Sequence, residues 1–143
     1  MLYLGADHAG YELKEKFKRF LEKEGFQYID MTPTFVEGDD YPDVAKKIGT
    51  MIAREHGEGV LICGSGAGIC MAANKIKGIR AALCYNKETA RLAKEHNNAN
   101  VICFGGRTMT LKDISENFKE WASRSFSSEE RHHRRIRKID ALE

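Results

Sequence analysis

The chain has 143 residues, which is the size of one ordinary domain and enough to bury a core without disulfides or a structural metal. Its 42% apolar and 31% charged residues are typical of a globular protein and argue against disorder. The net charge of +2 gives no overall field for nucleic acid, and no apolar run reaches the roughly 18 residues of a transmembrane helix.

The N-terminal part of the chain predicts two strands, each followed by a helix. Leu2–Ala6 and Phe26–Met31 are the apolar runs that predict the strands, and the first run lacks the basic segment of a secretory signal peptide. Residues 13–21 and residues 44–52 carry apolar side chains at i, i+4, i+7 and i+8, which predicts the helices. Thr32–Asp43 is expected to be a polar loop.

The rest of the chain predicts three further strands. Val60–Cys63 is almost wholly apolar, as expected of a strand covered on both faces, and leads through Gly64–Gly68 into a short helix. Ile79–Cys84 and Asn100–Phe104 predict the last two strands. Three more helices are expected: one capped by Asn86, one opened by the capping box Thr110-x-x-Asp113, and a basic one opened by Ser127-x-x-Glu130.

Five strands that alternate with helices predict a five-stranded parallel sheet in a Rossmann-like three-layer α/β/α sandwich. We expect a single domain over residues 1–143, with an additional C-terminal basic helix at about residues 128–143, and the doubly wound strand order 2-1-3-4-5. In such sheets ligands bind at the carboxyl ends of the strands. Those ends carry Asp7-His8, Cys63–Gly68, Tyr85-Asn86 and Gly105–Arg107.

Cys63 and the glycines that follow it are the strongest candidate site. Glycines at 64, 66 and 68 let the backbone approach a ligand closely, and the free amides of this segment favour an anion. The same amides favour the thiolate form of Cys63, which suits a base or a nucleophile. The alternative is a tight structural turn with a buried cysteine.

Known phosphate-binding loops do not fit this segment. Ile69 stands where a dinucleotide fingerprint has its third glycine and where a cysteine phosphatase has its arginine, and no Walker A lysine is present. No nicotinamide, flavin or nucleotide cofactor is therefore expected. The other cysteines, Cys70, Cys84 and Cys103, are interpreted as packing residues, and the absence of a Cys-x-x-Cys pair argues against zinc.

Asp7, His8 and Arg107 are further candidates at strand ends. Asp7 and His8 could orient a substrate hydroxyl and a phosphate, or could form a polar turn in which Asp7 caps the next helix. Arg107 follows two glycines and could clamp a phosphate.

Two candidate groups lie outside the strand ends. His96 and Asn97 stand at a helix stop, where Asn97 or Asn98 could take the left-handed conformation without any ligand. Arg131 and Arg135, at i and i+4, could grip one phosphate together, although a solvated helix face is the simpler interpretation of this basic run.

Several segments, in order along nearly the whole chain, resemble type B ribose-5-phosphate isomerases, the family that includes the galactose-6-phosphate isomerase subunits. These segments are Asp7-His8-Ala9-Gly10, Asp40-Tyr41-Pro42, Ile62–Ile69, Ala72–Lys75, Gly78–Ala81, His96–Asn100 and Arg131-His132. The segments Thr32–Asp39 and Ser128–Glu130 depart from the family's usual pattern.

The resemblance implies a cytoplasmic aldose–ketose isomerase of the pentose phosphate pathway that uses no metal or cofactor. It would interconvert D-ribose 5-phosphate and D-ribulose 5-phosphate through an enediolate. An allose-6-phosphate or galactose-6-phosphate isomerase is the alternative, and the presence of His96 favours the pentose. A non-catalytic sugar-phosphate sensor would more naturally have lost Cys63, and a nucleic-acid binder would carry interleaved aromatic residues.

The same resemblance implies a role for each site residue. Cys63 is the base, Ser65 belongs to the catalytic loop, His96 opens the sugar ring, and Asp7 moves hydroxyl protons. The implied substrate contacts are His8, Gly64, Gly66, Ala67, Gly68, Asn97, Arg107, Arg131 and Arg135.

The expected topology separates His96 from Cys63. Cys63 ends a strand, whereas His96 ends a helix that runs antiparallel to the strands, and a five-residue strand spans about 17 Å. If both residues serve one substrate, His96 comes from a partner chain. We therefore expect a homodimer, or a homotetramer, with shared active sites, in which Arg131 and Arg135 act from either chain. Neither nucleic acid nor a membrane is expected as a partner.

Overall fold

The five strands form one parallel sheet. The computed structural model describes residues 1–143, and every pair of neighbouring strands is parallel. The strands are β1 (Leu2–Ala6), β2 (Tyr28–Asp30), β3 (Glu58–Cys63), β4 (Ala81–Leu83) and β5 (Val101–Gly105). The helices are α1 (Tyr11–Lys23), α2 (Tyr41–Glu55), α3 (Ala67–Ala73), α4 (Lys87–Glu95), α5 (Leu111–Ala122) and α6 (Glu130–Asp140). The predicted α/β class and the alternation of its elements are confirmed.

The strand order is β2-β1-β3-β5-β4, so the predicted order 2-1-3-4-5 is wrong for the last two strands. β5 pairs with β3 from Gly59↔Val101 to Cys63↔Gly105, and β4 pairs with β5 at the edge of the sheet. All residues of β5 are buried, whereas the three residues of β4 are half-buried. A wholly apolar strand fits the centre of a sheet that is covered on both faces, and this preference outweighs the order of the strands along the chain.

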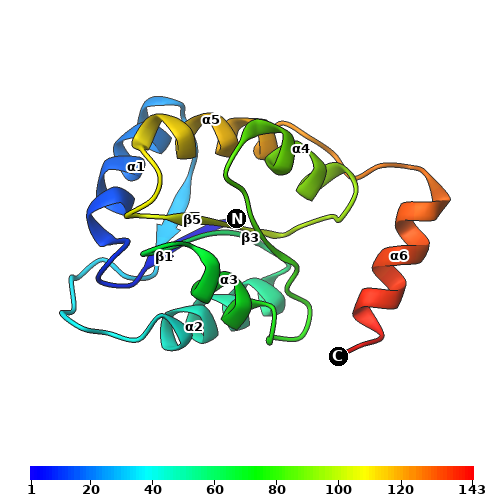
Figure 1. Ribbon diagram of the computed structural model, residues 1–143, viewed down its shortest axis with the longest axis horizontal. Helices are drawn as coiled ribbons and strands as arrows, with labels where there is room; N and C mark the ends of the chain where they lie inside the picture. The colour runs from blue at the N-terminus through cyan, green and yellow to red at the C-terminus, as the bar shows by residue number, and fades with distance from the viewer.

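Helices cover both faces of the sheet (Figure 1). α1, α4 and α5 lie on one face, where Phe17, Phe104 and Phe118 pack in the same core. α2 and α3 lie on the other face, with Ile48 and Ile69 fully buried against Leu61. The capping boxes predicted at the starts of α4 and α5 are present. None of the helices has the length and apolar character that crossing a membrane requires.

Helix α6 lies to one side of the three layers (Figure 1). It is shorter than the predicted range, and its N-cap is Glu129 rather than the predicted Ser127. The hydroxyl of Ser127 instead accepts a hydrogen bond from the amide of Glu129, which forms a turn before the helix begins. An ion pair between Arg80 and Asp140, 3.3 Å apart, ties the end of α6 to the segment before β4.

A buried ion cluster joins α1 to the end of β2. The Lys14 side chain is fully buried, and its Nζ donates to Asp30 Oδ2 at 2.7 Å and to the carbonyl of Thr32 at 2.7 Å. Lys18 approaches the same carboxylate oxygen at 2.9 Å. Burial alone would raise the pKa of Asp30, but the hydrogen bonds from Lys14 and Lys18 outweigh it and lower the pKa.

We expect Asp30→Asn to lower the free energy of unfolding by about 3 kcal/mol, because it leaves the buried Lys14 ammonium with only the partly exposed Glu15 as counter-ion. The pKa of Asp30 is lower in the folded than in the unfolded state. Its contribution is therefore complete above the unfolded pKa of about 3.9 and is lost as the pH falls through the folded value. Urea unfolding from pH 7 downward measures both effects.

The matched control for this prediction is Glu12→Gln. It removes the exposed partner of Lys16 on the same helix and should leave the unfolding curve unchanged. If Asp30→Asn unfolded at the wild-type urea concentration, the ion cluster would have no stabilising role.

Candidate active site

The carboxyl ends of β1, β3 and β5 lie side by side, because β3 lies between the other two strands. We call this side of the sheet the Cys63 edge. The amide of Asp7 donates to the carbonyl of Ile62 at 3.2 Å, and the amide of Gly106 donates to the carbonyl of Cys63 at 2.7 Å. The amide of Arg107 donates to the carbonyl of Gly64 at 2.9 Å. The corrected strand order thus places Arg107 beside the Cys63 loop and moves the end of β4 away from it.

The Cys63 side chain is held by the loop that follows it. Cys63 is 3% exposed, and its Sγ accepts a hydrogen bond from the amide of Gly66 at 3.2 Å. Gly66 has a φ of 81°, and a Cβ at this position would lie 2.8 Å from the carbonyl carbon of Phe104, so glycine is required here. The loop therefore holds a backbone donor against the sulfur of Cys63.

The other loop residues differ in exposure and contacts. Ser65 is exposed, and its Oγ accepts a hydrogen bond from the amide of Ala67 at 3.3 Å. A Cβ on Gly68 would lie 2.6 Å from the ring of Tyr41, so that ring covers the start of α3. The sequence analysis gave Tyr41 no role, because its contact with Gly68 comes from the packing of α2 against α3.

Asp7 is buried beside Cys63. It is 3% exposed, and its Oδ1 accepts hydrogen bonds from the amides of Ala9 and Gly10, both at 3.0 Å. Burial raises the pKa of Asp7, and the hydrogen bonds from these amides and the nearby His8 only reduce the effect. Asp7 therefore forms the predicted polar turn, but it does not cap the next helix, because α1 has Gly10 as its N-cap and no side-chain cap hydrogen bond.

A cavity of about 540 Å³ opens beside this edge. Its basic side chains are His8, Lys16 and Arg107, and its acidic side chain, Glu12, pairs with Lys16 at 2.7 Å. The remaining lining residues are Ala9, Leu13, Gly106, Met109, Thr110 and Leu111. The excess of basic groups suits the anionic part of a ligand.

His96 and Asn97 lie beside the amino ends of the strands, on the opposite side of the sheet from Cys63. We call this side of the sheet the His96 edge. Asn98 has a φ of 45° and turns the chain from α4 into β5, so the left-handed helix stop is present. The carbonyl of Asn100 accepts a hydrogen bond from the amide of Gly59 at 2.8 Å, which fixes this segment at the amino end of β3. Gly59 and Cys63 stand at the two ends of a β3 segment that spans about 13 Å.

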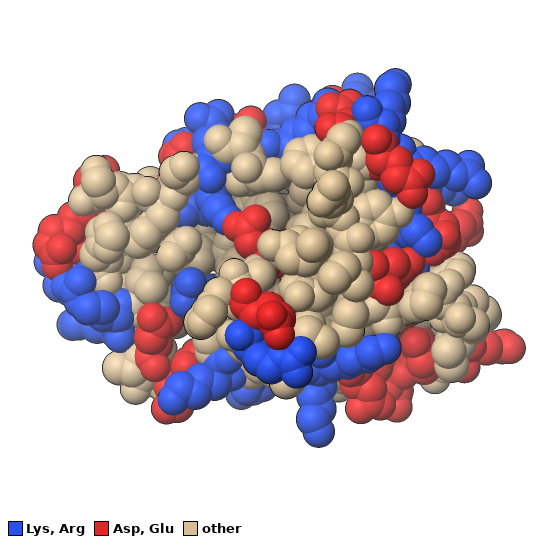
Figure 2. Space-filling view, turned by 180° about the vertical axis from the view of Figure 1, so that it is seen from behind, with Lys and Arg blue, Asp and Glu red and all other residues tan.

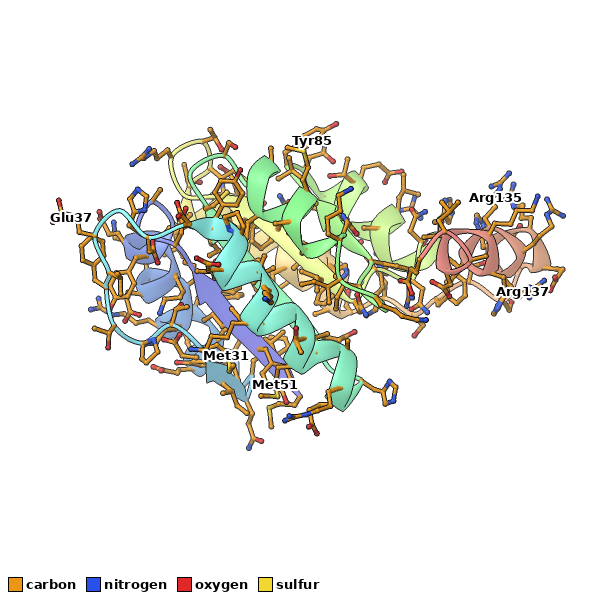
Figure 3. All side chains as sticks on the ribbon, turned by 90° about the horizontal axis from the view of Figure 1, so that it is seen from below. Met31, Glu37, Met51, Tyr85, Arg135 and Arg137 are labelled. Atoms are coloured by element: carbon orange, nitrogen blue, oxygen red, sulfur yellow. The ribbon has the colours of Figure 1, made fainter.

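Arg131 and Arg135 also lie away from the Cys63 edge. Both are exposed on α6, and Arg131 Nε lies 2.7 Å from Glu129 Oε2. Figure 3 shows Arg135 at one end of the molecule and Glu37, in the loop before α2, at the other. Within one chain, the structure therefore brings together the predicted residues at positions 7, 8, 63–68 and 107, and separates from them the residues at 96, 97, 131 and 135.

His132, for which the sequence predicted no role, packs against His96. The rings of His96 and His132 stack with centroids 4.2 Å apart and planes 18° apart. His132 is 2% exposed, and its Nε2 has no hydrogen-bond partner. Ile136, four residues further along α6, is also buried. This i, i+4 pair marks the packed face of α6 and was the available sequence signal.

The fold and these groups define an α/β protein with a site for a small anionic molecule at the carboxyl ends of its central strands. Comparison with known proteins identifies the particular group. The family model described as ribose/galactose isomerase matches residues 2–139. The chain belongs to this family.

Relatives and solved structures agree with the family model. The probable ribose-5-phosphate isomerase B of Mycoplasma pneumoniae is 42% identical, over 99% of this chain and 94% of that protein. The structure of Trypanosoma brucei type B ribose 5-phosphate isomerase matches with a TM-score of 0.94 at 41% identity, over 99% of this chain and 97% of that chain. The structure of Mycoplasma genitalium ribose-5-phosphate isomerase B with bound ribulose-5-phosphate has a TM-score of 0.92 at 38% identity, with 99% and 94% covered.

Proposed function

We propose that this protein is an aldose–ketose isomerase that interconverts D-ribose 5-phosphate and D-ribulose 5-phosphate in the cytoplasm. Family membership and the relatives named ribose-5-phosphate isomerase B support this reaction. The observation that carries the proposal is the hydrogen bond from Gly66 to Cys63 Sγ at 3.2 Å, next to a basic cavity. The chain acts as a single isomerase domain and uses no cofactor.

Cys63 and Asp7 transfer the protons in this mechanism. After His96 opens the sugar ring, the Cys63 thiolate takes the proton from C2, and the C–H electron pair forms the enediolate with its charge on O1. Amides of the loop Gly64–Gly68, together with Ser65, stabilise that charge, at about 3–4 kcal/mol per well-placed donor. Asp7, whose pKa is raised by burial, moves the hydroxyl proton from O2 to O1. Cys63 then returns its proton to C1, which gives the ketose.

Phosphate binding in this proposal begins with the basic cavity. His8 and Arg107 line it from the ends of β1 and β5, on either side of β3, and would hold the phosphate of the open-chain sugar. Arg131 and Arg135 would add charge from α6. On the face that Figure 2 shows, Lys and Arg side chains are interspersed with Asp and Glu, and no continuous basic surface covers it. The charge pattern of that face thus gives no support for a nucleic-acid partner.

Each active site is shared between two subunits of a homodimer, and a homotetramer would pair such dimers. The separation of His96 from Cys63 within one chain supports this arrangement. The edge strand β4 supports it too, because its three residues are half-buried, Tyr85 is 66% exposed, and a largely apolar cavity of about 340 Å³ lies beside it. A two-fold axis beside β4 and perpendicular to the strands would bring the His96 edge of one chain to the Cys63 edge of its partner.

The test of the reaction is an isomerase assay with ribose 5-phosphate against allose 6-phosphate and galactose 6-phosphate. We expect the highest kcat/KM with the five-carbon sugar. A higher kcat/KM with a six-carbon sugar phosphate would favour the alternative members of the family, and no turnover of any of the three would contradict an isomerase.

We also expect the isomerase activity to be unchanged by EDTA, because the proposed proton transfers use Cys63 and Asp7 and require no Lewis acid. The measurement compares initial rates before and after prolonged incubation with the chelator, followed by dialysis. If EDTA abolished the activity and a divalent cation restored it, the metal-free mechanism would be wrong.

A further inference from the structure

We infer that Asp39, in the loop between β2 and α2, is a positioning residue that fixes the orientation and the tautomer of His8 for the phosphate end of the substrate. This inference rests on the proposed function, because it concerns how the same site recognises a phosphorylated sugar. Asp39 is absent from the residues that the family resemblance implies, and its role follows from its contacts in the fold.

Three contacts join Asp39 to His8. The backbone amide of His8 donates to Asp39 Oδ1 at 2.6 Å. The ring Nδ1 of His8 lies 3.1 Å from the same carboxylate oxygen and 3.1 Å from the backbone carbonyl of Asp39. A carboxylate oxygen and a carbonyl oxygen can only accept hydrogen bonds, so Nδ1 must carry a hydrogen and donate it. The other ring nitrogen, Nε2, is then the one left for a ligand.

The bond at Nδ1 also determines how the ring can contact a phosphate. With Nδ1 occupied by Asp39, a phosphate oxygen can hydrogen-bond to Nε2, with the ring or the phosphate carrying the proton between them. Glu12, Lys16 and Arg107 line the same cavity as His8. Asp39 is the charged side chain that contacts the ring nitrogen, so it is the group expected to hold the ring in one tautomer.

The loop that carries Asp39 is fastened at its beginning. The hydroxyl of Thr32 accepts a hydrogen bond from the amide of Ala6 at 3.0 Å, and its carbonyl accepts one from Lys14 Nζ at 2.7 Å. Tyr11 donates its hydroxyl to the carbonyl of Pro33 at 2.9 Å. The loop is therefore held against β1 and α1, and Asp39 can keep its position beside the His8 side chain, which is 34% exposed.

The variant Asp39→Asn keeps the size of the side chain and one acceptor oxygen but removes the charge. We expect the KM for ribose 5-phosphate to rise about tenfold and kcat to stay within about twofold, since a hydrogen bond with a charged group is lost at the binding end of the site. Asp39→Glu should recover part of the wild-type KM.

The matched control is Glu37→Gln. It removes one negative charge from the exposed tip of the same loop (Figure 3) and should leave KM and the His8 ring signals unchanged. A second readout needs no turnover: the ¹⁵N signals of the His8 ring, assigned with His8→Gln, report the proton on Nδ1 with and without inorganic phosphate. In the wild type they should show a proton on Nδ1 in both conditions, and Asp39→Asn should weaken this preference.

The outcomes separate this inference from the proposed function. If the wild type fails to isomerise ribose 5-phosphate, the proposed function fails, and the ring signals with inorganic phosphate still test Asp39. If Asp39→Asn folds, as circular dichroism would show, and matches Glu37→Gln in KM and ring signals, the positioning role is overturned. If Asp39→Asn does not fold, Asp39→Glu takes its place: a KM above the wild-type value together with altered ring signals supports the role, and altered ring signals at an unchanged KM overturn it.

Discussion

Cys63→Ala should lower kcat by about 10²–10⁴-fold and change the KM for ribose 5-phosphate by no more than a few-fold. The side chain lies at the end of β3, where the amide of Gly66 donates a hydrogen bond to its sulfur, and the proposed mechanism needs this sulfur to move the proton between C2 and C1. Binding depends instead on the basic cavity, which the substitution leaves intact. Steady-state kinetics in both directions of the isomerisation measure the effect.

Cys84→Ala is the matched control. Cys84 is fully buried, and burial raises the pKa of its thiol to about 12, so it stays protonated near neutral pH. Removing it should leave kcat close to that of the wild type. Cys63→Ser should be nearly as inactive as Cys63→Ala, because a hydroxyl gives far less of its conjugate base at neutral pH. Full activity in either Cys63 variant would show that another group moves the carbon-bound proton.

The helices and strands could be predicted from the sequence because their signals are local. The apolar spacing from Leu13 to Leu21 gave α1, and the Asn86 cap gave the start of α4. The strand order depends on which of β4 and β5 buries more of its residues in a central position. No local sequence pattern shows this. The wholly buried β5 takes that position, which leaves the short β4 at the edge.

The same distinction applies to the site. Asp7, Cys63 and Arg107 each follow a strand directly, so the fold class alone predicted that they would meet. Asp39 could not be found in this way, because 31 positions separate it from His8 and the contact depends on the path of the loop before α2. His132 was equally hidden, since its partner His96 belongs to a different helix end.

The corrected strand order strengthens the case for shared sites. With β4 at the edge, the short parallel strand leaves one row of backbone groups open beside an apolar cavity, which is the kind of edge that a second subunit covers. The C-terminal helix packs at the His96 edge through the His96–His132 stack. The residues at 96, 97, 131 and 135 therefore lie at the same end of the molecule, and would enter the partner's active site together.

Mixing two inactive variants, Cys63→Ala and His96→Ala, should restore activity to about a quarter of the wild-type value. With equal amounts and random exchange, half of the dimers are heterodimers. In each heterodimer one site combines both substitutions, and the other combines an intact Cys63 with an intact His96 from the partner. Activity is measured after subunit exchange, which two different affinity tags confirm.

The control mixes Cys63→Ala with Asp7→Asn. The amide of Asp7 bonds to the carbonyl of Ile62, so Asp7 and Cys63 lie at the same edge of one chain and belong to the same site. Every site in this mixture contains one of the two substitutions, and activity should stay at the level of the separate variants. If exchange is complete and Cys63→Ala with His96→Ala stays equally inactive, the shared site is wrong, and both residues act from the same chain.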